Sequence, residues 1–239
     1  TTGGSNIAIG KGSLINNTTA SDNTSIGTNA MIINTTGACN VAVGSSALYS
    51  NTTADNNTAI GVLALGANTT GSTNVAIGRK TMCTNTTGAN NTAIGNQSLE
   101  QNTTGANNTA VGLNVMLSNT SGCYNHALGR NTLMDNTTGC YSTAIGQQAL
   151  QNSSATGDTG NTAVGALALY ENTSATNNTA VGRLALSCNT TAAGNVAVGS
   201  LAGQAITTGH SQTALGFCAL MTATTGEGNT ALGNGALKL

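Results

Sequence analysis

Residues 91–107 read Asn-Thr-Ala-Ile-Gly-Asn-Gln-Ser-Leu-Glu-Gln-Asn-Thr-Thr-Gly-Ala-Asn, one complete copy of a unit that fills the chain. The opening Asn-Thr-Ala-Ile-Gly recurs with close variants fourteen times, and twelve of the thirteen intervals between copies are 17 residues long. The remaining interval, from Ser142 to Asn161, has 19 residues. Such self-similarity is typical of a solenoid, in which one structural unit stacks on copies of itself. The sequence therefore predicts an all-β parallel β-solenoid of about fourteen 17-residue coils, with residues 1–239 forming a single repeat domain.

The composition excludes several classes of partner. Only 5% of the residues are charged, the net charge is −1, and the charges are scattered singly, so no nucleic acid or acidic membrane partner is expected. No apolar run is long enough for a transmembrane helix, so membrane insertion is not expected either. The chain opens at Thr1 without a charged and then apolar leader, which predicts a mature or trimmed fragment.

Two columns of the repeat are consistently aliphatic. With the motif Asn as position 1, position 4 is Ile, Val or Leu in every copy, and position 9 is Leu or Met in all copies but one, where Gly203 stands. We expect these two columns to form the apolar core of the coils. The clearest members are Ile9, Ile26, Val43, Ile60, Ile77 and Ile94 at position 4, and Leu48, Leu65, Leu99 and Leu150 at position 9.

Position 5 is glycine in every copy and directly follows the short strand. A glycine at such a place is expected where the backbone has a positive φ or where another backbone comes very close. We therefore predict structural turns at Gly10, Gly27, Gly44, Gly61, Gly78 and Gly95.

Alanine occupies position 3 in thirteen copies. Because side chains alternate along a strand, this alanine must face away from positions 2 and 4, and one of these two faces is the coil interior. If position 4 is inside, the alanines form an uncharged outer ribbon that suits close approach by another chain. The sequence does not settle which face is inside.

Charged residues mark the exposed corners. Five of the six basic residues lie at positions 6 or 7, and six of the seven acids lie at positions 10, 11, 16 or 17. Contacts with a glycan or protein receptor are expected at these corners. The candidates are Lys11, Arg79, Lys80, Arg130, Arg183, Tyr124 and Tyr141.

Asparagine recurs at position 12, usually as Asn-Thr-Thr. One interpretation is a structural ladder of stacked amides that bond to one another and to the turn backbone. The other is N-glycosylation, because Asn-x-Thr is also the acceptor triplet of a secretory pathway. Both interpretations apply to Asn34, Asn51, Asn68, Asn85, Asn102, Asn119 and Asn136.

The residues that could carry chemistry are few. Cys123 and Cys140 share position 16 on adjacent coils, so their Cα atoms are expected about 5 Å apart, compatible with a disulfide or with two reduced thiols. The six cysteines have no metal-type spacing, and neither His126 nor His210 has a Ser, Cys or acid at the spacing of a triad. We expect no catalytic residue, metal, cofactor or enzymatic activity.

The unit Asn-x-Ala-Ile-Gly, as in residues 6–10, 74–78 and 195–199, resembles the head repeats of YadA-like trimeric autotransporter adhesins. The longer unit Asn-Thr-Ala-Ile-Gly-x-x-Ala-Leu-x-x-Asn-Thr-Thr-Gly is similar to repeats in fibre-like proteins of bacteria and phages, which often precede a self-cleaving C-terminal chaperone. The resemblance covers essentially the whole chain and implies a left-handed parallel β-roll in each chain, with three chains associated around an axis.

Three functions follow as hypotheses. The first is an extracellular structural fibre or adhesin, at a cell surface or on a virion, that spaces or presents a binding activity. Its variant is a self-assembling extracellular filament. The second is an ice-binding solenoid, because Thr recurs at positions 2, 13 and 14. An enzyme is the third, and no group of residues supports it.

Overall fold

The computed structural model describes residues 2–154 and 156–238, and within them it is an all-β parallel β-solenoid of about 13 turns without a helix. The described chain divides into two compact units, Thr1–Ser121 and Gly122–Leu239, and each is described by itself. The expectation of one domain over residues 1–239 stays a prediction.

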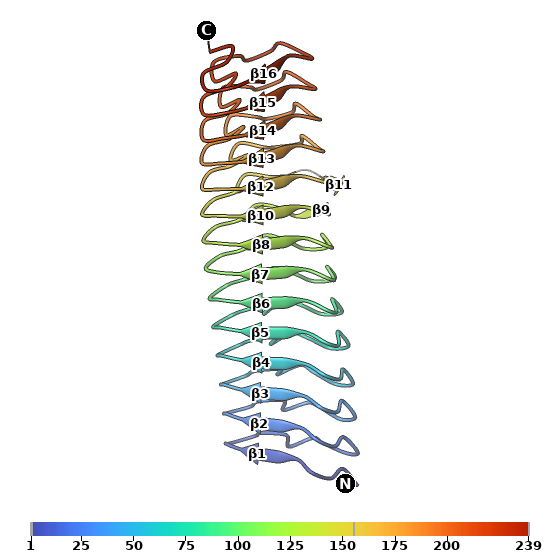
Figure 1. Ribbon diagram of the computed structural model, residues 1–239. Coiled ribbons are helices and arrows are strands. Elements are labelled where there is room, and N and C mark those ends of the chain that lie inside the picture. Colours follow the sequence, from blue (N-terminus) through green and yellow to red (C-terminus); the bar gives the residue numbers. More distant parts are fainter. Residues whose placement is uncertain (1, 155, 239) are drawn as a thin grey trace. The chain divides into compact units, whose positions relative to one another are not determined.

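The first unit has one three-residue strand per coil (Figure 1). Its strands are parallel, and each pairs with the next strand in the sequence. Equivalent positions of successive repeats lie beside each other, so that Thr58 lies beside Val75 and Val75 beside Thr92. These strands are β1 (Ile7–Ile9), β2 (Thr24–Ile26), β3 (Val41–Val43), β4 (Thr58–Ile60), β5 (Val75–Ile77), β6 (Thr92–Ile94) and β7 (Thr109–Val111).

The second unit repeats this pattern with β8 (His126–Leu128), β10 (Thr143–Ile145), β12 (Thr162–Val164), β13 (Thr179–Val181), β14 (Val196–Val198), β15 (Thr213–Leu215) and β16 (Thr230–Leu232). It also contains a small second sheet, formed by β9 (Thr138–Cys140) and β11 (Thr156–Asp158). β11 lies in the one 19-residue interval, and Figure 1 shows β9 and β11 beside the main row of strands. The two extra residues therefore extend one corner and leave the main ladder in register.

Hydrogen bonds between coils continue around the whole circumference. In the strands, the amide of Thr24 donates to the carbonyl of Asn40 at 2.8 Å. On the far sides of the coil, the amides of Leu48 and Thr86 donate to the carbonyls of Ala64 and Thr103 at 3.0 and 2.9 Å. Each bond joins residues 16 or 17 apart, so a coil satisfies its backbone through the next coil, which is why the repeat length hardly varies.

The glycines at position 5 have both properties that would require glycine. From Gly10 to Gly95 their φ values lie between 120° and 138°. A Cβ on Gly44 would lie 2.6 Å from the carbonyl oxygen of Gly61 in the next coil. Any side chain here would therefore separate neighbouring coils.

The core of each coil contains one large apolar side chain. Leu48, Leu65, Leu99 and Leu150 at position 9 are fully buried. These leucines have φ values of 48° to 51°, in the left-handed region that costs a side-chain-bearing residue about 1–2 kcal/mol. Burying a leucine contributes about 1.5–3 kcal/mol, which offsets that strain.

Candidate interaction surface

The main strands present position 3 to the interior and positions 2 and 4 to the outside. Ala59, Ala76 and Ala93 have no exposed surface, whereas Ile60 and Ile94 are 38% and 37% exposed. The expectation that position 4 fills the core is therefore wrong. It fails for Ile9, Ile60 and Ile94, which are exposed, and for Ile26, Val43 and Ile77, which are half-exposed.

The reason lies in the width of the coil. Its interior already holds the large residue at position 9, a small residue at position 8 such as Ala47 or Ala64, and two asparagines. Only a methyl group fits beside them, so the strand turns its alanine inward. The alanines are consequently an inner lining, and the outer ribbon expected from them does not exist.

The outer face instead has a continuous aliphatic row in each unit. Strand register places the position 4 side chains directly beside one another from coil to coil. The row of the first unit is Ile9, Ile26, Val43, Ile60, Ile77, Ile94 and Val111. The row of the second unit is Leu128, Ile145, Val164, Val181, Val198, Leu215 and Leu232. We call these two rows the outer aliphatic rows.

The surface beside each row is also uncharged. Position 2 carries Thr, Val or Ile throughout, except for His126 in the second unit. The basic side chains of Lys11, Arg79, Arg130 and Arg183 are exposed at the corners that follow the strands, as expected from their positions. Lys80 is half-buried and forms an ion pair with Glu100, with 3.5 Å between Nζ and Oε1. Each unit thus has an outer sheet face on which the aliphatic row runs beside a column that is mostly threonine, and polar corners border this face.

The asparagines at position 12 form an internal ladder. In the first unit, Nδ2 of Asn85 donates to Oδ1 of Asn68 at 2.8 Å, and Nδ2 of Asn102 donates to Oδ1 of Asn85 at 2.7 Å. Each Nδ2 also donates to the carbonyl three residues later, such as that of Gly88 at 3.0 Å.

These side chains are inaccessible. Asn34, Asn51, Asn68, Asn85, Asn102, Asn119 and Asn136 have at most 1% of their surface exposed. A glycan on any of them would have to leave through the packed core. For the folded chain, the glycosylation interpretation is therefore wrong and the ladder interpretation is right.

A second ladder, at position 1, was not expected from the sequence. The Oδ1 atom of Asn57 accepts from the backbone amide of Asn74 at 2.9 Å, and Nδ2 of Asn57 donates to the carbonyl of Gly71 at 3.0 Å. Nδ2 of Asn68 donates to the same Gly71 carbonyl at 2.9 Å. Two side-chain amides of one coil therefore converge on one carbonyl, and the recurrence of Asn at position 1 in twelve of the fourteen copies is the signal that could have revealed this role.

Cys123 and Cys140 lie together in the second unit. Their Sγ atoms are 2.8 Å apart, and the backbone amide of Cys123 donates to Sγ of Cys140 at 3.0 Å. Both are free thiols in the structure. Partial burial, then the hydrogen bond with Cys140 and the charges of Cys140 and Asp158, raise the pKa of the Cys123 thiol to about 11. Beside them the rings of Tyr124 and Tyr141 are stacked, with centroids 5.2 Å apart and planes 2° apart.

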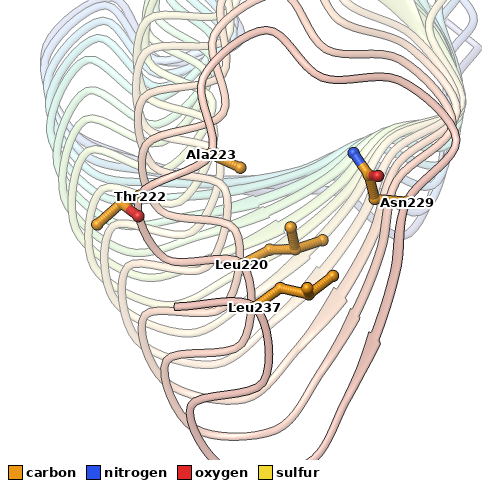
Figure 2. Close-up of a pocket in the computed structure, with 5 residues that line it drawn as sticks. All are labelled: Leu220, Thr222, Ala223, Asn229 and Leu237. Carbon is orange, nitrogen blue, oxygen red and sulfur yellow. The ribbon is translucent and has the colours of Figure 1, made fainter. Parts of the chain in front are cut away.

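One cavity lies inside the last coils of the second unit (Figure 2). It has a volume of about 180 Å³ and is lined by Leu220, Thr222, Ala223, Asn229 and Leu237. Figure 2 shows the side chains of Leu220 and Leu237 close together, with Asn229 across the coil from Ala223. None of these five residues has an ionisable side chain, so none of them can act as a general acid or base near neutral pH.

Over residues 2–154 and 156–238, no group of three or more His, Cys, Asp or Glu side chains is placed to hold a metal ion. The same residues include no helix with the length and hydrophobicity needed to span a bilayer. His126 and His210 are both exposed, and Nδ1 of His210 accepts from the backbone amide of Ala193 at 3.0 Å.

No protein-family model matches the chain, and neither a curated protein nor a solved structure is detectably similar to it.

Proposed function

We propose that this chain is the rigid shaft or head of an extracellular structural fibre or adhesin, and that copies of it associate through their outer aliphatic rows. The role is structural and binding, not enzymatic. The observation that carries the proposal is the pair of outer aliphatic rows, in which Ile, Val and Leu side chains stand in register on an uncharged sheet face.

A contiguous apolar face of this kind is costly to leave in water. Monomeric soluble proteins rarely expose large contiguous apolar patches, and such patches mark association sites. Ile60 and Ile94 are more than one-third exposed, and Leu128 is 50% exposed. Covering the rows would therefore add substantially to the small core of each coil.

A second copy of the same chain fits this surface better than an unrelated partner. The rows repeat once per coil, and only a partner with the same repeat can match them side chain for side chain along their length. Copies arranged around an axis parallel to the row would bury all of it at once. The resemblance to trimeric adhesin heads favours three copies and a left-handed coil, and both remain predictions.

The remaining features suit a spacer that presents a ligand-binding surface. The backbone hydrogen bonds between coils resist bending in both units, and the asparagine ladder at position 12 adds to them in the first unit. The corners are exposed and vary from coil to coil, as at Lys11, Arg79 and Tyr124. We infer that a glycan or protein receptor binds at such corners, outside the packed columns.

Introducing negative charges on the outer face tests the proposal. In the double variant Ile60→Glu/Ile94→Glu, burying an unpaired carboxylate at each association site should cost about 3–5 kcal/mol per site. The native mass is then expected to fall to that of one chain, while the far-ultraviolet circular dichroism of the β-solenoid is retained. The matched control is Asn96→Glu at an exposed corner, which should keep the native mass of the unmodified chain. An unchanged mass in the double variant would rule out the outer aliphatic rows as the interface.

The ice-binding alternative is supported by one further observation. Thr36, Thr53, Thr70, Thr87 and Thr104 at position 14 are all exposed, one per coil, in the first unit. Their neighbours at position 13 use their hydroxyls internally, as Thr35 Oγ1 donates to the carbonyl of Thr52 at 3.0 Å. A single exposed column is narrow for binding an ice plane. A thermal-hysteresis measurement is expected to show no activity, and a freezing point lowered below the melting point would favour this alternative instead.

A further inference from the structure

The cysteine pair of the second unit is placed differently from the other cysteines. Cys123 and Cys140 occupy the same column on adjacent coils, with Sγ atoms 2.8 Å apart. The other four occupy four different columns of the repeat. Cys39 and Cys188 are exposed, Cys83 is half-buried, and Cys218 is buried.

The backbone on both sides of the pair holds this arrangement. The amide of Tyr141 donates to the carbonyl of Cys123 at 3.2 Å, and the amide of Thr159 donates to the carbonyl of Cys140 at 3.1 Å. β9 ends at Cys140 and is paired there with Asp158 of β11. Tyr124 and Tyr141, which directly follow the two cysteines in the chain, have stacked rings. The sulfur atoms are therefore brought together by the fold itself and need only a small side-chain movement to bond.

We propose that Cys123 and Cys140 form an intrachain disulfide that staples two adjacent coils of the second unit, by exchange with a low-molecular-weight disulfide such as oxidised glutathione. The bond is a structural modification, and it depends on the fold and not on the proposed fibre function.

The two thiols have distinct parts in the exchange. The backbone amide of Cys123 donates to Sγ of Cys140 at 3.0 Å and holds this sulfur in place. The Cys140 thiolate attacks one sulfur of oxidised glutathione and forms a mixed disulfide, and the first glutathione leaves as a thiolate. The Cys123 sulfur then attacks the Cys140 sulfur of the mixed disulfide and expels the second glutathione. The two cysteine protons end on the two glutathione thiols, the cysteines are oxidised by two electrons, and the glutathione disulfide is reduced by two.

The raised pKa of Cys123 agrees with this order. With a pKa of about 11, its thiol is protonated near neutral pH, so it is a poor first nucleophile. It becomes the resolving thiol only once Cys140 carries the glutathione.

The test is to equilibrate the purified full chain with oxidised glutathione, alkylate the remaining thiols, unfold it without reductant and digest it with trypsin. Cleavage after Lys80, Arg130 and Arg183 places Cys140 alone in residues 131–183, and places Cys83 and Cys123 in residues 81–130. We expect these two fragments to be joined in a chain that remains monomeric on a non-reducing denaturing gel. Reduction should separate them.

Two variants make the assignment specific. The joined fragments should persist in Cys83→Ser and disappear in Cys140→Ser. The oxidised chain should also melt about 5–10 °C higher than the reduced chain, because the bond closes a loop of fewer than 20 residues. Alkylated Cys140 in a free fragment 131–183, a linkage lost in Cys83→Ser, or a covalent dimer would each overturn the proposal. None of these readouts depends on the native mass, so failure here is separable from failure of the fibre proposal.

Discussion

Gly44→Ala is expected to destabilise the first unit by about 4 kcal/mol or more, lowering its melting temperature by about 10–15 °C. Gly44 has a φ of 137°, a value that a residue with a Cβ rarely adopts. The new methyl group would lie 2.6 Å from the Gly61 carbonyl oxygen and 2.7 Å from its carbon, in a backbone that is itself bonded to the next coil. Neither atom can move without breaking the ladder.

Gly66→Ala is the matched control, since Gly66 lies in the next coil. A Cβ there meets nothing closer than the Leu63 carbonyl oxygen at 3.4 Å, and other coils carry Tyr49 or Glu100 in the same column. Its melting temperature should stay within a few degrees of the unmodified chain, within the range of about 0.5 kcal/mol typical of surface changes. Circular dichroism measures the melting temperature of both variants. If the two substitutions lower it equally, close coil packing is not the reason for glycine at position 5.

Asn85→Asp should be the most damaging conservative change in the asparagine ladder. It preserves the size of the side chain and the acceptor for Asn102, but it removes the Nδ2 donor to Asn68 and Gly88. A fully buried carboxylate then faces other acceptors, which costs about 3–5 kcal/mol at pH 7.

The pH dependence of this variant has a definite sign. Burial raises the pKa of a carboxyl group above its unfolded value, so folding is favoured by protonation and stability is lost as pH rises through the folded pKa. Lowering the pH to about 4 should therefore recover part of the lost stability relative to the unmodified chain. The control is Asn96→Asp at the exposed corner, expected to cost less than about 0.5 kcal/mol at either pH. Chemical denaturation at both pH values gives the free energy of unfolding of the unmodified chain and the two variants. Equal losses of this free energy in the two variants would contradict a buried ladder.

The period of the sequence was sufficient to predict the architecture. The invariant Gly column and the recurrent Asn columns indicate backbone constraints, and in the structure these are the tight corner at Gly44 and the buried amides at Asn85. The orientation of the strand could not be predicted, because an alternating Thr-Ala-Ile strand is compatible with either face being inside. Side-chain size favoured isoleucine in the core. The leucine at position 9 leaves little space inside the coil, and this space requires alanine at position 3. Only the folded coil reveals how small that space is.

Paired substitutions within one coil also could not be predicted from each column of the repeat taken separately. Gly203 departs from Leu at position 9, yet it keeps the left-handed φ of its column at 57°. Ile206 stands where position 12 is usually Asn and is 1% exposed. A Cβ on Gly203 would lie 2.8 Å from Cδ1 of Ile206, so the isoleucine fills the space that leucine leaves. The two departures therefore compensate each other: the core loses a large side chain at position 9 and gains one at position 12 of the same coil.

The native mass of the unmodified chain, measured by light scattering over a dilution series, tests most directly whether the outer aliphatic rows are an interface. One chain has a mass of 23.4 kDa. Association through the rows predicts a defined multiple of that mass, which the resemblance to trimeric heads puts at three chains, and a very large polydisperse mass would indicate a filament. A mass of 23.4 kDa at every concentration would contradict self-association and leave the aliphatic rows exposed on a monomer.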